Sequence, residues 1–295
     1  MSTPAIDITG LTKTYGRDRG IEDVNLRIEE GEIFGFIGPN GAGKSTTIRV
    51  LLNLLFPTSG KAQILGLDVA RDSKEIKYHT GYVPSDANAY SQMEADEFFR
   101  YCGRFFRSDG NERRIRELTE LFEVDRRRKI SDLSMGNRKK ISIIQSLLHK
   151  PKLLIVDEPT TGLDPLMQAR FFELLRSENH RGMTVFYSSH SLSDVQMLCR
   201  RVAIIGEGRI ITVEEIEALR KRQLKKIYIE FNNSENNTVM ELPGIEDTPL
   251  ISGRTVKFLY SGDINRLISA LHDRGIADMT IEEPSLEEIF MHYYY

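Results

Sequence analysis

Two spacings of apolar residues alternate along the first two hundred positions, and together they predict an α/β fold. Short apolar runs that suit strands occupy residues 6–8, 24–28, 32–37, 153–156, 184–188 and 202–205. From about residue 85 to 150 the apolar residues instead recur three or four positions apart, as in Phe98, Tyr101, Cys102 and Phe105. We therefore predict a helical insertion within a strand–helix alternation.

Capping and breaking residues predict where helices begin and end. One helix should run from Lys44 to about Leu55, ahead of Pro57, and another should begin at the Asp164-Pro165 pair. Thr212 with Glu215 has the spacing of a capping box for a third helix, which would end in the basic run 220–226.

A change of composition in that basic run predicts a domain boundary. We expect a main domain at residues 1–222, with its helical subdomain at about 85–150, and a small α+β domain at 223–295. In the second domain strands are predicted at 227–231, 255–260 and 279–282, and helices near 264–273 and 285–293.

Charge and hydropathy narrow the classes of function. The net charge of −3 argues against nucleic-acid binding, which needs a basic surface. No stretch approaches the roughly 20 apolar residues of a membrane helix, and the first residues lack the layout of a signal peptide. We therefore expect a cytoplasmic protein.

The segment after the strand predicted at 32–37 has the composition of a phosphate-binding loop. Its residues are, in order, Gly38, Pro39, Asn40, Gly41, Ala42, Gly43, Lys44, Ser45 and Thr46. Small residues let backbone N–H groups surround a phosphate at the positive end of the following helix. We expect Lys44 to reach the β- and γ-phosphates and Ser45 to bind Mg²⁺. The loop predicts a nucleotide but not what the nucleotide drives.

Two carboxylates follow the apolar run 153–156. Because ligands of open α/β sheets bind at the carboxyl ends of the strands, Asp157 and Glu158 should face the nucleotide. Asp157 would hold Mg²⁺, and Glu158 would polarise the attacking water as general base.

A third segment, Leu133-Ser134-Met135-Gly136-Asn137, opens a predicted helix and resembles the signature motif of the ABC (ATP-binding cassette) family. The resemblance implies a P-loop ATPase core with a mixed sheet and a helical subdomain. It also implies that Ser134 and Gly136 contact the γ-phosphate of ATP bound to a second ATP-binding subunit.

Further positions match the family in chain order. Tyr15 resembles the aromatic residue that stacks on adenine, and Asp164, in Gly162-Leu163-Asp164, resembles the loop that links the two sites. His190, after Ser188-Ser189, resembles the switch histidine that contacts the γ-phosphate and helps Glu158 hold water.

The end of the chain resembles one branch of the family. Residues 284–290 are similar to the closing segment of ATPase subunits from drug- and antibiotic-export systems. This implies that ATP hydrolysis powers export through a separate membrane-spanning permease subunit. The chain would lie at the inner face of the cell membrane and contact the permease through residues 85–107. Homodimer and heterodimer both stay open.

Two departures from the family pattern affect the expected site. Ser85 stands where the family usually has a longer Gln or Glu that reaches Mg²⁺, so we expect it to act through water or with help from Asp86. Met135 and Asn137 also differ from the usual signature, which predicts slower or differently regulated hydrolysis.

Two other classes stay open. One is an ABC ATPase that acts on ribosomes, DNA or assembly scaffolds; the single cassette and the lack of heptads in the insertion disfavour it. The other is a regulatory subunit that binds ATP without hydrolysing it, which Ser85 favours and Glu158 disfavours. Ordinary P-loop kinases and GTPases are disfavoured by the signature segment.

Overall fold

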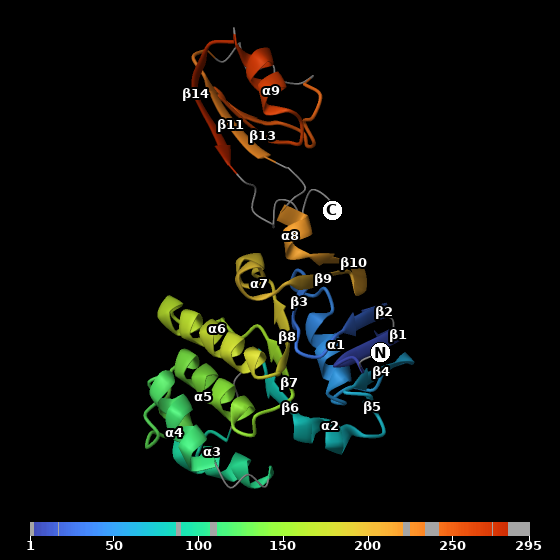
Figure 1. Cartoon of the computed structure of the whole chain (residues 1–295), viewed down its shortest axis with the longest axis vertical. Coiled ribbons are helices and arrows are strands. Elements are labelled where there is room, and N and C mark those ends of the chain that lie inside the picture. Colours follow the sequence, from blue (N-terminus) through green and yellow to red (C-terminus); the bar gives the residue numbers. More distant parts are fainter. Residues whose placement is uncertain are drawn as a thin grey trace. The chain divides into compact units, whose positions relative to one another are not determined.

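The strand–helix alternation of the first 214 residues builds two sheets, shown in Figure 1. The strands of the first sheet are β1 (Ile6–Tyr15), β2 (Asp18–Ile28), β4 (Ser59–Ile64) and β5 (Leu67–Asp68). Those of the second are β3 (Ile33–Ile37), β6 (Thr80–Val83), β7 (Leu153–Asp157), β8 (Thr184–Ser189), β9 (Arg201–Gly206) and β10 (Arg209–Glu215). This computed structural model describes residues 3–16, 18–86, 90–106, 111–220, 225–233, 242–272 and 274–282.

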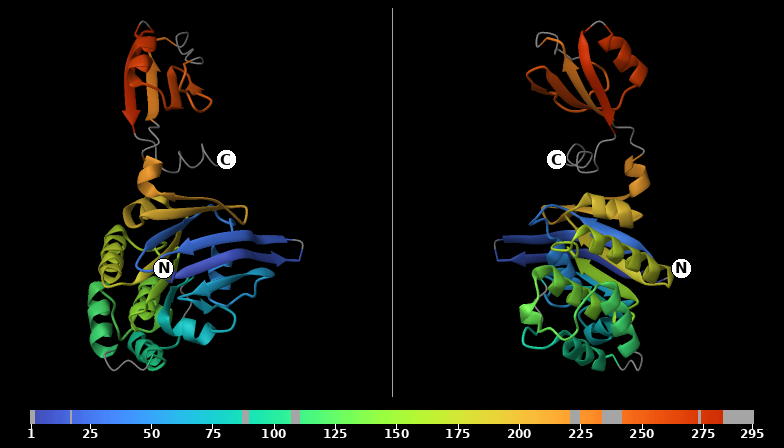
Figure 2. Two further views of the ribbon diagram at one scale, coloured as in Figure 1. Left: turned by 45° about the vertical axis from the view of Figure 1, so that its right-hand side comes forward. Right: turned by 90° about the vertical axis from the view of Figure 1, so that its left-hand side faces the viewer.

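The two sheets differ in strand direction, so the core has the mixed character expected of it. The first sheet is antiparallel with the order β2-β1-β4-β5, and Figure 2 shows β1 and β2 as a long ribbon. The second has the order β10-β9-β3-β8-β7-β6 and is parallel from β9 to β6. Its parallel strands bring the residues that follow β3, β7 and β8 to one edge.

Helices connect and cover these strands. They are α1 (Lys44–Leu51), α2 (Ser73–His79), α3 (Ala95–Arg104), α4 (Asn111–Leu121), α5 (Met135–Leu147), α6 (Pro165–His180) and α7 (Leu192–Leu198), with a short 3₁₀ turn at Ile130–Asp132. Helix α1 contacts β7 on one side and β2 and β4 on the other. It ends earlier than predicted because Asn53 adopts a φ of 53°, outside the helical region.

Helices α3, α4 and α5 pack on one another between β6 and β7 of the chain, as the helical spacing predicted (Figure 1). Strand β7 is buried along its whole length, which confirms the prediction from its apolar run. One apolar core joins both sheets through α1, with Leu153 and Phe186 on one side and Ile6 and Leu11 on the other. Burial of these side chains holds the nucleotide edge of the sheet in place.

Residues Glu215–Tyr295 form a second compact unit, which begins a few residues before the boundary expected at 222–223. After α8 (Ile216–Arg220), its sheet has the order β12-β13-β11-β14, with strands β11 (Lys225–Phe231), β12 (Leu250–Ser252), β13 (Thr255–Tyr260) and β14 (Ile276–Glu282). Helix α9 (Ile264–Leu271) packs on it through Leu267 and Leu271. The helix expected near 285–293 lies outside the described residues.

One predicted helix start is wrong. Thr212 and Glu215 belong to β10, and α8 begins only at Ile216. The Thr212 hydroxyl donates to the Glu214 carboxylate at 3.2 Å instead of capping a helix. Strand β10, which pairs with β9, includes this segment, and sheet formation overrides the local capping signal.

A histidine between the helical insertion and the sheet makes stability depend on pH. His149 stacks on Phe106 with ring centroids 3.8 Å apart, and neither ring nitrogen has a hydrogen-bond partner among the described residues. Burial lowers the pKa of His149 from 6.5 to about 4. The unfolded chain therefore binds the extra proton first as pH falls below 6.5, and stability is lost between about pH 6.5 and pH 4.

We expect His149 to remove about 2 kcal/mol from the free energy of unfolding between pH 7 and pH 5. His149→Phe keeps the stacked ring and should abolish that part of the loss. Urea unfolding at both pH values measures it, with the exposed His180→Phe as control. Equal losses in wild type and His149→Phe would contradict the prediction.

Candidate active site

The phosphate loop, residues 38–46, joins β3 to α1. Gly41 and Gly43 have φ angles of 81° and 107°, which glycine adopts without strain. A Cβ at Gly38 would lie 2.2 Å from the carbonyl oxygen of Ile205, so no side chain fits there. Gly43 precedes α1 and supplies no side-chain cap, so the first N–H groups of the helix can bind an anion.

The other residues of the phosphate loop have the exposure and the backbone contacts expected of a loop that surrounds a phosphate. Pro39 and Asn40 are exposed, whereas Ala42 is buried beneath the loop. Ala42 donates its backbone N–H to the Pro39 carbonyl at 3.1 Å, which closes the turn. Thr46 lies half-buried in the first turn of α1.

Lys44 curls back over the loop. Its ammonium donates to the carbonyls of Gly38, at 2.7 Å, and Pro39, at 3.1 Å, and it lies 3.5 Å from Oε1 of Glu158. The side chain is 5% exposed. A buried cation that donates to two carbonyls and lies near a carboxylate can exchange these contacts for phosphate oxygens.

Asp157, at the end of β7, is held between two serines. Ser45 of α1 donates to its Oδ2 at 2.8 Å, and Ser188 of β8 donates to its Oδ1 at 3.2 Å. Burial raises the pKa of Asp157, while the hydrogen bonds from both serines oppose the rise. A nearby cation would favour its ionised form.

Glu158 connects the phosphate loop to His190. Its Oε1 faces Lys44, and its Oε2 lies 3.2 Å from Nδ1 of His190. Its backbone has a φ of 49°, and its N–H donates to the Ser188 carbonyl at 3.0 Å. The left-handed turn, unusual for a glutamate, directs the carboxylate away from the strand and into the site.

The oxygens of Ser45 and Asp157 fit Mg²⁺, which prefers hard oxygen ligands and completes its shell with water and substrate phosphates. Within the ranges that the structure describes, no group of three or more His, Cys, Asp or Glu side chains could hold a metal ion by itself. The geometry therefore suits an ion that arrives with a nucleotide.

Tyr15 lies close to the phosphate loop, with Gly20 between them. A Cβ atom added at Gly20 would lie 2.8 Å from the Tyr15 ring, and a Cβ atom added at Gly43 would lie 3.1 Å from the Gly20 carbonyl oxygen. The ring is 43% exposed, with the Lys13 ammonium 5.5 Å from its centroid. An exposed face next to the phosphate loop is available for stacking on a base.

The signature segment does not meet the phosphate loop of its own chain. In the described ranges, the Ser134 hydroxyl accepts only from the Asn137 N–H, at 3.3 Å, as the cap of α5. Gly136 packs against Gly162, whose carbonyl oxygen would lie 2.4 Å from an added Cβ. Asp164 caps α6 by accepting from the Met167 N–H at 3.0 Å.

Ser85 follows β6, beside Asp157 at the same edge. Its carbonyl accepts from the ammonium of Lys139 at 2.8 Å, and within the described chain its hydroxyl has no hydrogen-bond partner. Because the serine side chain is short, we expect a contact between Ser85 and the Asp157 carboxylate to be made through a water molecule.

Ser85→Gln should raise the basal ATPase rate or the affinity for Mg²⁺ by about threefold or more, since the longer amide can span the gap that serine leaves. Phosphate release across a Mg²⁺ titration measures both quantities. Ser85→Ala is the matched control and should give neither increase. An unchanged rate together with an unchanged Mg²⁺ dependence in Ser85→Gln would contradict the expectation.

Sequence reasoning missed two residues at this edge. Ser188 was assigned only to a strand, yet it holds Asp157. Lys139 belongs to a basic run, yet it is 2% exposed and contacts the Ser85 loop. Helical spacing could have revealed it, because Lys139 lies one turn before the buried Ile143 on the same helix face.

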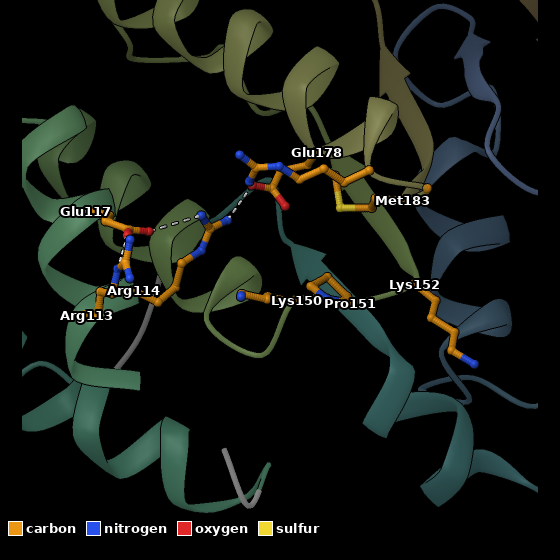
Figure 3. Close-up of a pocket in the computed structure, with 10 residues that line it drawn as sticks. Arg113, Arg114, Glu117, Lys150, Pro151, Lys152, Glu178 and Met183 are labelled. Atoms are coloured by element: carbon orange, nitrogen blue, oxygen red, sulfur yellow. Dashed lines mark hydrogen bonds and ion pairs between the residues drawn. The ribbon is translucent and has the colours of Figure 1, made fainter. Parts of the chain in front are cut away.

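A pocket of about 650 Å³ lies away from this site, beside the starts of β7 and β8 (Figure 3). Arg114 bridges Glu178, at 2.8 Å, and Glu117, at 3.8 Å. The Arg114–Glu178 pair joins α4 to α6, so the pocket is part of a link between the helical insertion and the sheet. The nucleotide motifs lie at the opposite ends of the same strands.

Comparison with known proteins identifies the family of this chain. The family model described as ABC transporter matches residues 21–161. The bacitracin transport ATP-binding protein BcrA of Bacillus licheniformis is 34% identical, with 99% of this chain and 97% of BcrA covered. The linearmycin resistance ATP-binding protein LnrL of Bacillus subtilis is 29% identical, with 95% of each chain covered.

Solved structures support the same assignment. An ATP-binding subunit of an ABC transporter superposes with a TM-score of 0.70 at 28% identity, covering 75% of this chain and 93% of its own. An ATP-binding cassette solved as a dimer after hydrolysis, with ADP and phosphate, gives 0.66 at 25% identity, covering 72% and 98%. No helix in the described ranges has the length and apolar content to span a membrane. This chain belongs to the ABC transporter family, as an ATP-binding and ATP-hydrolysing subunit.

Proposed function

We propose that two copies of this chain close around two ATP molecules and thereby drive export through a separate membrane-spanning permease. The observation that supports this proposal is that the expected site residues fall into two separate groups. Lys44, Glu158 and His190 form one continuous set of contacts, while the hydrogen bond of the Ser134 hydroxyl among the described residues is the cap of its own helix. Each copy would therefore offer two incomplete halves, which a second copy completes.

The phosphate loop would bind the β- and γ-phosphates through its N–H groups and Lys44, with Mg²⁺ held by Ser45 and Asp157 and, through water, Ser85. That ion would neutralise developing charge on the phosphates. Tyr15 would stack on the adenine. The partner's Ser134 and Gly136 would complete the γ-phosphate contacts, and Asp164 would stiffen the loop between the two sites.

Glu158 would accept a proton from the attacking water as general base. Its Oε2 is near enough to His190 for that histidine to fix the carboxylate, and Lys44 restrains Oε1. ATP favours the closed pair because only that state satisfies both sets of γ-phosphate contacts. Loss of the γ-phosphate would release the pair.

Residues 85–107 would carry this motion to the permease. Phe105, which directly follows α3, and Tyr90, five residues before that helix, are 61% and 57% exposed. Large apolar side chains at these positions suit a protein partner. The names of two relatives, which refer to bacitracin transport and linearmycin resistance, support an export system. In such a system the chain would lie at the inner face of the cell membrane.

The test is purification of the chain from its native membranes in mild detergent. We expect a polytopic membrane protein to copurify in near-equal amount, and the amount to fall when Phe105 is replaced by Glu. Recovery of ribosomes, nucleic acid or only soluble proteins would contradict the proposed role in transport. It would favour an ABC ATPase that acts on ribosomes, DNA or assembly scaffolds.

A further inference from the structure

Lys139 connects two parts of the active site that lie 54 residues apart in the chain. It is in the second turn of α5, and its ammonium donates to the carbonyls of Pro84, at 2.9 Å, and Ser85, at 2.8 Å. The residue is 2% exposed. The loop after β6 is thus fixed to the helix that carries the signature segment.

Burial of the Lys139 ammonium costs free energy that an apolar side chain with only a packing role would not cost. Burial lowers the pKa of Lys139 to about 8, against the opposing attraction of Asp157, Asp86 and Glu158. In the described chain no carboxylate forms an ion pair with it. A methionine would fill a similar volume without the desolvation cost, so the contribution of Lys139 must come from its polar contacts.

The sheet register shows why this contact affects the site. Val83, the last residue of β6, pairs with Val156 of β7, so the chain leaves β6 at Pro84 level with Asp157, the residue after Val156. Ser134 and Gly136 precede Lys139 by less than two turns of the same helix. A shift of the Pro84–Ser85 loop is therefore transmitted to the signature segment by one side chain.

We propose that Lys139 is a positioning residue for ATP hydrolysis, which locks the Ser85 loop to the signature helix so that both move as one unit. The inference rests on the proposed function. The short side chain of Ser85 extends only a little way into the site. The effect of this loop on the site therefore depends mainly on the position of its backbone. Lys139 provides this control through two charge-assisted hydrogen bonds.

The test uses the purified full chain with Mg-ATP and compares Lys139→Met with Lys139→Arg. Lys139→Met should lower kcat about tenfold or more and change KM by less than about threefold, because the ATP contacts of the phosphate loop are intact. Lys139→Arg keeps the charge and the donors, and should recover kcat to within about threefold of wild type. Lys150→Met, which removes an exposed ammonium, is the control.

Thermal unfolding and ATP binding show whether each variant folds. Should Lys139→Met not fold, Lys139→Gln, whose side chain is about one bond shorter than that of lysine and carries no charge, gives the same comparison. A kcat within threefold of wild type in the folded variant, or an Arg variant as slow as the Met variant, would overturn the inference. Wild-type chain without Mg-ATPase activity would instead overturn the proposed function itself, and the inference with it.

Discussion

Glu158→Gln should lower the ATPase rate by about a hundredfold or more and leave ATP affinity within about threefold of wild type. The amide cannot accept a proton from water, which removes the general base. It keeps the shape of the carboxylate between Lys44 and His190, which lie 3.5 Å and 3.2 Å from its oxygens. Phosphate release and equilibrium binding of ATP measure the two effects separately.

Glu173→Gln is the matched control, since it neutralises an exposed carboxylate on α6. It should change neither quantity. A Glu158→Gln rate within tenfold of wild type would assign the general base to another group, and Asp157 would be the first to examine because it lies at the same edge.

Gly136→Ala should lower the ATPase rate about thirtyfold or more, with ATP binding to the isolated chain unchanged. The added Cβ would lie 2.4 Å from the Gly162 carbonyl oxygen, so the signature segment or the loop before Asp164 has to move. Both segments are assigned to the contact between subunits, where a displacement of about 1 Å is costly to catalysis.

Gly182→Ala is the control for replacing a glycine as such. Its φ of 101° makes the substitution strained, yet its added Cβ meets nothing within 4 Å. We expect lower stability but the normal rate per folded molecule. Full activity in Gly136→Ala would show that the Gly136–Gly162 contact is not needed for hydrolysis.

The parts of the site that sequence predicts are those whose chemistry is local. The phosphate loop needs small residues between a strand and a helix, and both neighbours are visible in the apolar pattern. Asp157 could be placed beside Ser45 because parallel strands deliver their ends to one edge, and the structure joins the two at 2.8 Å.

Contacts between distant segments could not be predicted in this way. β4 and β5 carry few buried apolar residues and form because β1 offers a partner, so no periodicity marks them. Thr212 shows the reverse, since sheet pairing overrode a valid capping signal. Helical spacing places Lys139 on a buried helix face, but its hydrogen bonds to the Pro84 and Ser85 carbonyls are visible only in the fold.

The most direct test of the shared site is the mass of the Glu158→Gln chain in solution, because this variant should bind ATP without hydrolysing it. We predict sedimentation as a dimer with Mg-ATP and as a monomer with Mg-ADP or without nucleotide. Ser134→Ala in the same background should weaken the dimer. A chain that stays monomeric when saturated with ATP would contradict the account that two copies complete each site.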